Sequence, residues 1–216
     1  MKLRIFMFAP VLIGLMVANA DAQFGVTGGV NISGPKGISN ASVKDGVIAG
    51  VFMQYGLVEG VSLRPELLFS VKGANWQIPL DPLSARPQNP TNNTLTLTYV
   101  EVPILLRLDM LTLPILPINV DIFAGPDFAL NVGSSVRSTS TITGRTTVIS
   151  ESGNTYPFDF NIAVGAGPSL NLGSMTMGAE ARYTFGTSPV LKNETVGGIM
   201  KDGRNGVWSI MASLEF

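Results

Sequence analysis

The sequence predicts an all-β protein, an eight-stranded antiparallel up-and-down transmembrane β-barrel. Three observations support this fold class. The stretch Phe158–Leu172 alternates apolar residues with polar or very small ones, which is the pattern of a β-strand with two different faces. Seven further strand-length segments follow from the sequence, most of them with the same alternation, and their connections are sorted by length. Only 13% of the residues are charged, against about 25% in ordinary soluble domains.

The N-terminus has the three parts of a secretory signal peptide. Lys2 and Arg4 give a positive start, Ile5–Val17 is apolar, and Ala18–Ala22 holds two overlapping A-x-A cleavage sites. We therefore predict a signal peptide over residues 1–22 and a barrel domain over residues 23–216. The alternative is a short uncleaved anchor helix, which is disfavoured because a spanning helix needs about 20 apolar residues.

The first three strands are predicted over Phe24–Ser33, Gly46–Val58 and Val61–Gly73. In the first and third, apolar side chains share one face, and Leu68 is the only break in the polar face of the third. The second strand is apolar on both faces, so the sequence leaves its orientation open. Gly34–Val43 is predicted as a loop and Glu59-Gly60 as a tight turn.

Strand four is predicted to begin at Thr94, and strand five covers Ile118–Val132. Leu95 and Leu97 set the apolar face at the start of strand four, where the apolar residues are odd-numbered. From Val100 onward the apolar face consists of even-numbered residues. This change of phase predicts a β-bulge near Tyr99–Val100. The Pro- and Asn-rich stretch Trp76–Asn93 is predicted as a long loop, and Asp109–Pro117 as a medium connection.

The last three strands are predicted over Phe158–Leu172, Met175–Phe185 and Val207–Phe216. Gly173-Ser174 is the short turn between the first two, while Gly133–Tyr156 and Gly186–Asn205 are predicted as long loops. Two similar segments contain Gly125-Pro126 and Gly167-Pro168. Because proline has no N–H to donate to a neighbouring strand, we expect irregular pairing beside both.

Connection lengths run long, short, long, medium, long, short, long. Since an antiparallel meander places successive connections at opposite ends, every long loop falls at one end of the barrel. Outer-membrane barrels have this asymmetry, with short periplasmic turns and long external loops. An even strand number then places both termini on the periplasmic side.

Charged strand residues lie opposite the apolar face wherever the two faces can be distinguished. Eight strands enclose an interior just wide enough for side chains, and aromatic residues gather at strand ends as in interfacial girdles. We therefore predict that the apolar face meets lipid and that the lumen holds a charge network. Its predicted members are Arg64, Glu66, Lys72, Glu101, Arg107, Asp121, Asp127, Asp159, Glu180 and Arg182.

Composition excludes several functional classes. Histidine and cysteine are both absent, so Ser-His-acid catalysis and thiolate metal sites are ruled out. Pairs such as Glu180 and Arg182 are interpreted as interior ion pairs rather than as acid–base machinery. The net charge of −1 offers no basic surface for nucleic acid. We expect no enzymatic activity, no cofactor and no metal.

Several motifs resemble the PorT-type family of outer-membrane β-barrels. They are Leu67-Leu68-Phe69-Ser70-Val71-Lys72-Gly73, the Tyr99-Val-Glu-Val-Pro-Ile-Leu-Leu-Arg107 strand and Phe123-Ala-Gly-Pro. The resemblance implies an eight-stranded barrel in the bacterial outer membrane, and its namesake is similar to an accessory of a protein-secretion and gliding apparatus. The final strand also looks like the C-terminal signal read by the barrel-assembly machinery, through Trp208, Ile210, Ala212, Leu214 and Phe216.

Three functional hypotheses follow. The favoured one is a non-enzymatic barrel in outer-membrane lipid whose long loops contact the exterior or envelope proteins, as an accessory to secretion or envelope assembly. The second is a narrow passive pore, which requires an open lumen. The third is a soluble periplasmic lipid-binding barrel, which requires an apolar lumen.

Overall fold

The computed structural model describes residues 22–36, 41–78, 90–113, 118–150, 155–187 and 204–216. None of these residues forms a helix long and apolar enough to cross a membrane. They form ten β-strands: β1 (Ala22–Lys36), β2 (Ala41–Ser42), β3 (Lys44–Val58), β4 (Val61–Ile78), β5 (Thr91–Leu113), β6 (Ile118–Ser140), β7 (Thr146–Ser150), β8 (Phe158–Asn171), β9 (Thr176–Gly186) and β10 (Arg204–Glu215).

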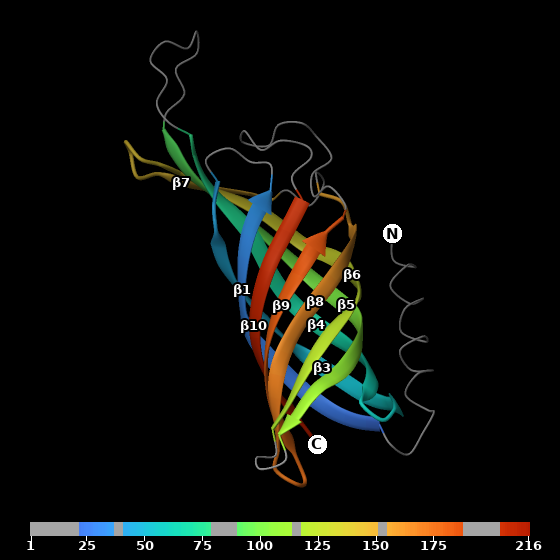
Figure 1. Cartoon of the computed structure of the whole chain (residues 1–216). Helices are drawn as coiled ribbons and strands as arrows, with labels where there is room; N and C mark the ends of the chain where they lie inside the picture. The colour runs from blue at the N-terminus through green and yellow to red at the C-terminus, as the bar shows by residue number, and fades with distance from the viewer. Residues whose placement is uncertain (1–21, 37–40, 79–89, 114–117, 151–154, 188–203) are drawn as a thin grey trace.

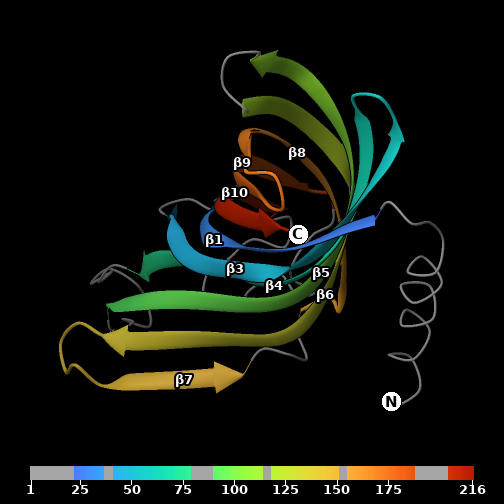
Figure 2. The same cartoon turned by 90° about the horizontal axis from the view of Figure 1, so that it is seen from below.

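Eight of these strands close into an antiparallel ring, as Figures 1 and 2 show from the side and from below. Its order is β1, β3, β4, β5, β6, β8, β9 and β10, and β10 pairs with β1 again. At the seam, the backbone N–H of Phe216 donates to the carbonyl oxygen of Phe24 over 2.8 Å. The predicted eight-stranded antiparallel barrel is therefore confirmed. β2 and β7 are extra strands that pair with β4 and β6 outside the ring.

The two ends of the barrel differ in their connections, as predicted. At the turn end, β3 and β4 are joined by Glu59-Gly60, where Gly60 takes a positive φ of 74° that favours glycine. At the same end, the N–H of Leu172 donates to the carbonyl oxygen of Met175 over 2.9 Å in the connection from β8 to β9. The longer connections lie at the opposite end, which we call the loop end.

Burial along the strands confirms the two predicted faces. On β8, Phe158, Phe160 and Ile162 are exposed on the outer surface, while Asp159, Asn161 and Ala163, which alternate with them, are buried. The structure also settles the orientation of β3, which the sequence left open. Ile48 and Phe52 point inward, and Val51 lies on the outer face. An apolar band therefore surrounds the barrel.

The prediction of a β-bulge near Tyr99–Val100 is wrong in two respects: the extra residue lies on β6 and not on β5, and β5 does not exchange its two faces. From Leu95 through Arg107 the odd-numbered residues all point inward, so the alternation of β5 continues without a change of phase. Leu95 and Leu97 therefore point inward and not, as predicted, toward the outer apolar face. The register shift lies on the partner strand, because Thr98 pairs with Gly133 and Tyr99 with Asn131, leaving Val132 of β6 as the extra residue.

Several predicted loops are shorter than expected because the strands run further. β1 continues through Gly34 to Lys36, β4 ends at Ile78 and β5 at Leu113. The largest correction concerns Gly133–Tyr156, where β6 extends to Ser140 and turns back as β7. Thr and Val residues favour strands, and Gly144 has the positive φ of 67° that this turn uses. Most of Gly186–Asn205 lies outside the described residues.

The two Gly-Pro segments show the expected irregular pairing. Between β8 and β9, Ala166 pairs with Ala181, and the next pair is Ser169 with Gly178. Gly167 and Pro168 are therefore unpaired in this ladder, and the register is the same on both sides of them. The ladder between β5 and β6 is interrupted in the same way beside Pro126. A Cβ on Gly167 would collide with the carbonyl oxygen of Ala179 on the neighbouring strand, so glycine permits the close approach of the two backbones.

Candidate functional site

All ten of the predicted lumen residues are buried inside the ring, each at most 7% exposed. The structure brings six of them into one ion-pair network, which we call the Arg–acid network. Its members come from β4, β5, β6 and β9: Arg64, Glu66, Arg107, Asp121, Glu180 and Arg182. It contains three guanidinium groups and three carboxylates, so its formal charges balance.

Arg182 connects opposite walls of the barrel. β9, which carries it, lies four positions away from β4 around the eight-stranded ring. Its guanidinium donates to both oxygens of Glu66 on β4, over 2.8 and 2.9 Å, and to Glu180 over 2.7 Å. Two parallel N–H···O bonds to one carboxylate are the strong form of this pair. The contact therefore crosses the whole lumen.

The other two arginines complete the network. Arg107 donates to Asp121 over 2.6 Å and to Glu180 over 3.1 Å, and Arg64 lies 3.0 Å from Glu66. Aromatic rings cover two of the cations. The Arg64 guanidinium carbon lies 3.5 Å from the centre of the Phe52 ring, and that of Arg107 lies 4.8 Å from the Phe123 ring. The middle of the lumen is filled by paired charges.

The remaining predicted residues lie apart from the Arg–acid network. Lys72 forms an ion pair with Glu101, with 2.5 Å between Nζ and Oε1. Asp127 accepts a hydrogen bond from the Nδ2 group of Asn161 over 3.2 Å. Asp159 is buried on β8, opposite Ala129 of β6. The structure therefore brings six of the ten predicted residues into the Arg–acid network and places the other four outside it.

An apolar cluster inside the barrel was missed by the sequence patterns. It lies toward the loop end and contains Trp76, Leu95, Leu97, Tyr99, Ala129 and Val136. The patterns place Trp76 in a loop, and Leu95 and Leu97 on the outer face. One signal could have revealed the cluster, because Leu95 through Arg107 keep an uninterrupted alternation if the inward face is allowed to be apolar. The cluster lies on the loop-end side of the Arg–acid network, at the level of Lys72 and Asp159.

The buried acidic groups do not form a chelating set. Across the described ranges, no group of three or more Asp or Glu side chains is arranged to hold a metal ion. The carboxylates of the Arg–acid network are bound to guanidinium groups, which favours a structural role.

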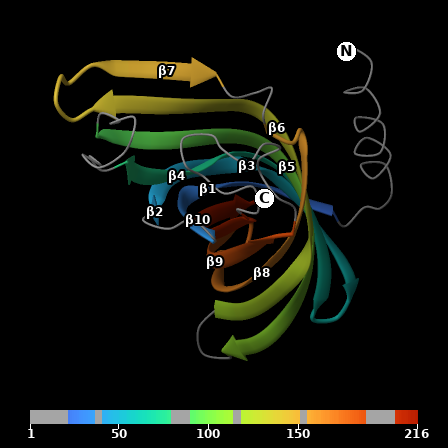
Figure 3. The ribbon, with the colours of Figure 1, turned by 90° about the horizontal axis from the view of Figure 1, so that it is seen from above.

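A hairpin at the loop end carries exposed surface outside the apolar band. β6 and β7 form a hairpin that projects beyond the ring, as Figure 3 shows from above. We call residues 133–150 the β6–β7 hairpin. Ile142 at its turn is 65% exposed, and Val148 and Ile149 on β7 are 58% and 52% exposed. Arg137 and Arg145 are also exposed there, so the hairpin presents apolar and cationic groups together.

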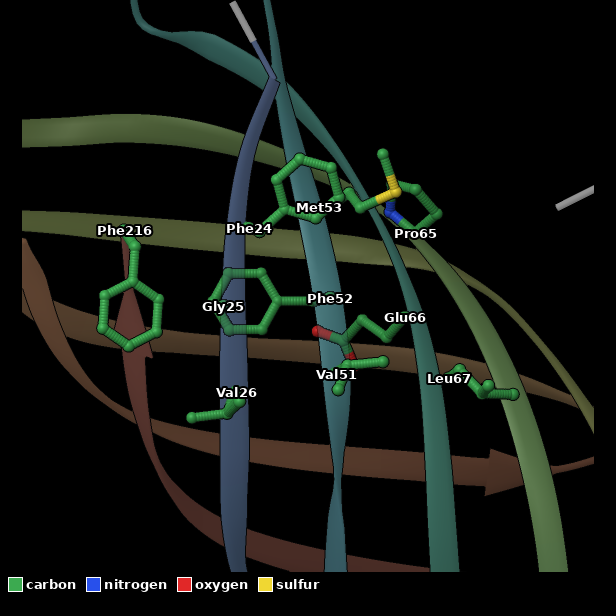
Figure 4. A pocket seen from close by; sticks show the side chains of 10 residues that line it. All are labelled: Phe24, Gly25, Val26, Val51, Phe52, Met53, Pro65, Glu66, Leu67 and Phe216. Atoms are coloured by element: carbon green, nitrogen blue, oxygen red, sulfur yellow. The ribbon is translucent and has the colours of Figure 1, made fainter. Parts of the chain in front are cut away.

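A shallow apolar pocket of about 420 Å³ lies near the turn end, where the β3–β4 ladder is interrupted opposite Pro65 (Figure 4). Most of its lining consists of residues of the outer face, including Phe24, Val51, Met53, Leu67 and Phe216. An outward-facing, apolar lining suits an acyl chain. On β10, Trp208, Ile210 and Ala212 continue the exposed outer row of the predicted C-terminal signal, which ends at Leu214 and Phe216.

The comparisons with known proteins agree with this architecture. A family model described as "Outer membrane protein beta-barrel domain" matches residues 17–192. A major outer membrane protein from Thermus thermophilus is structurally similar, with a TM-score of 0.51, 11% identity, and 91% of this chain and 100% of that chain covered. Neisserial surface protein A gives a TM-score of 0.46 at 13% identity, covering 90% and 97%. The search of curated proteins gave no match.

Proposed function

Since the chain belongs to the outer membrane protein beta-barrel domain family, we propose that it is a non-enzymatic barrel of the bacterial outer membrane that displays the β6–β7 hairpin for contact. The observation that supports this role is the hairpin itself. It extends past the ring at the end where long loops gather. Its exposed Ile142, Val148 and Ile149 have no role in filling the lumen, so a contact surface is the role that fits them.

The proposed partners follow from the surfaces of the barrel. The apolar outer band and the pocket beside Pro65 suit lipid acyl chains. The hairpin suits an envelope protein, and the resemblance to the PorT-type family favours an accessory role in secretion or envelope assembly. The outward row of β10 is the surface that we propose the barrel-assembly machinery reads. A soluble lipid carrier fits less well, because the middle of the lumen holds ion pairs and most of the large apolar side chains on the strands of the ring face outward.

Surface display is tested by single cysteines, since the natural chain has none. We expect Ile142→Cys in the hairpin turn to react with a membrane-impermeant maleimide on intact cells. Glu59→Cys in the opposite turn should react only after the outer membrane is permeabilised. Labelling of Glu59→Cys alone on intact cells would reverse the proposed orientation. Equal labelling of both variants on intact cells would argue against a spanning barrel.

A passive pore is the second candidate, and the lumen argues against it. Arg182 and Glu66 join opposite walls, and the apolar cluster around Leu97 and Tyr99 lies above them. We expect the purified protein in planar bilayers to give no single-channel current above the lipid baseline. Stable, stepwise currents that depend on the amount of protein would establish a pore and contradict the closed lumen.

A further inference from the structure

β7 is the last strand of the sheet at the loop end. Within the part of the chain that the structure describes, β7 pairs with β6 alone. All five of its residues, Thr146–Ser150, are exposed. The strand therefore presents a sheet edge on the side away from β6.

The backbone direction at this edge follows from one hydrogen bond in the hairpin. The N–H of Ser140 donates to the carbonyl oxygen of Arg145 over 3.0 Å, so the backbone groups of Arg145 face β6. Because this orientation alternates along an antiparallel strand, Thr147 and Ile149 also bond toward β6. The N–H and C=O groups of Thr146 and Val148 then point outward from the sheet.

This edge lacks the features that normally prevent pairing. Natural edge strands are blocked by proline, by charged side chains or by a bulge. Residues 146–150 are Thr-Thr-Val-Ile-Ser and contain neither proline nor charge, and their register with β6 is continuous. Four of the five are β-branched, the type that packs best on strands. The edge is therefore suited to accept another strand.

We propose that this edge pairs with the β7 strand of a second copy of the chain, antiparallel and centred on Val148. In this register Val148 exchanges two hydrogen bonds with Val148 of the second copy, because its backbone groups point outward. The side chain of Thr147 then lies beside Ile149 of the second copy, a favourable β-branched pair. In the sequence the strand lies between Arg145 and Glu151, so antiparallel pairing of identical strands also matches unlike charges.

The orientation of the hairpin permits such a pair within one membrane. Figure 1 shows the β6–β7 ribbon nearly edge-on from the side, and Figure 3 shows it face-on from above. The plane of this part of the sheet therefore lies across the barrel axis. A two-fold axis that relates two antiparallel strands in one sheet is perpendicular to the sheet. It runs here along the barrel axis, so both barrels keep the same orientation in the bilayer.

Disulfide trapping tests the pair directly. A single Val148→Cys substitution, in cells that carry the full chain, places two thiols opposite each other at the centre of the proposed pair. We expect oxidation to give a disulfide-linked dimer on non-reducing gels, at a yield severalfold above that of Ile142→Cys. Ile142 is at least as exposed but lies in the turn, away from the edge.

A second variant separates edge pairing from random collision. Thr146→Pro, added to Val148→Cys, removes an outward N–H while leaving the bonds of Thr147 and Ile149 to β6 in place. We expect it to reduce the dimer yield severalfold. Equal yields for Val148→Cys and Ile142→Cys, or no effect of Thr146→Pro, would overturn the proposal. The inference rests on the proposed membrane placement, which the maleimide labelling of Ile142→Cys tests separately.

Discussion

Replacing Arg182 by methionine is expected to lower the free energy of unfolding of the barrel by about 3–5 kcal/mol, because it leaves buried carboxylates without their partner. Arg182 is 2% exposed and binds both Glu66 and Glu180. Methionine is unbranched and apolar, so the main loss is the positive charge. The free energy is measured by urea unfolding in lipid vesicles, followed by tryptophan fluorescence.

Two control variants show whether charge balance is the cause. Adding Glu66→Gln to Arg182→Met restores a neutral network, and we expect the double variant to regain part of the lost stability through a favourable coupling energy. Arg137→Met, on the exposed hairpin, should change stability by no more than about 0.5 kcal/mol. If Arg182→Met lowered the free energy of unfolding as little as Arg137→Met, the Arg–acid network would not hold the barrel walls together.

Side-chain alternation was sufficient to predict the ring. The two faces of β8 and the alternation of long and short connections follow from a period of two residues and from antiparallel geometry. Neither depends on knowing which strands face each other across the lumen. For the same reason, the sequence could place Arg64 and Arg182 on the inward face without identifying their partners.

Contacts across the lumen could not be read from the chain. Glu66 and Arg182 are separated by 116 residues, and their meeting depends on the stagger between strands as the sheet closes. Sequence spacing favours local pairs such as Glu180 and Arg182, which do meet, but it does not show that Glu180 also binds Arg107. The network therefore forms only when the eight strands close into the ring.

The mistaken predictions share one physical cause. The rule that apolar residues face lipid holds only at membrane depth, whereas Leu95 and Leu97 lie in the loop-end part of β5 and pack inside the barrel. The Ser/Thr-rich stretch after Val132 resembles a loop because it is polar. Strands outside the lipid need no apolar face, so its β-branched residues can extend the sheet. Because strands were expected to have an apolar face, the β6–β7 hairpin, which supports the proposed function, was predicted as a loop.

Introducing a charge on the lipid-facing surface should have the second large effect. Val164 lies near the middle of the fourteen residues of β8 and has the same parity as the exposed Ile162 and Phe160. We expect Val164→Arg to cost about 2–4 kcal/mol, since the guanidinium would lie near the bilayer midplane. Phe158→Arg, close to the strand end, should cost only about 0–1 kcal/mol.

The central claim is that the apolar face of this barrel meets lipid and the charged face fills the lumen. Its most direct test is the folded fraction of the wild type, Val164→Arg and Val164→Leu after refolding into lipid vesicles. Folded barrels resist detergent until heated, so gel migration before and after boiling gives this fraction. We predict that Val164→Leu folds like the wild type and that Val164→Arg folds in much lower yield. Equal yields for all three proteins would contradict the claim.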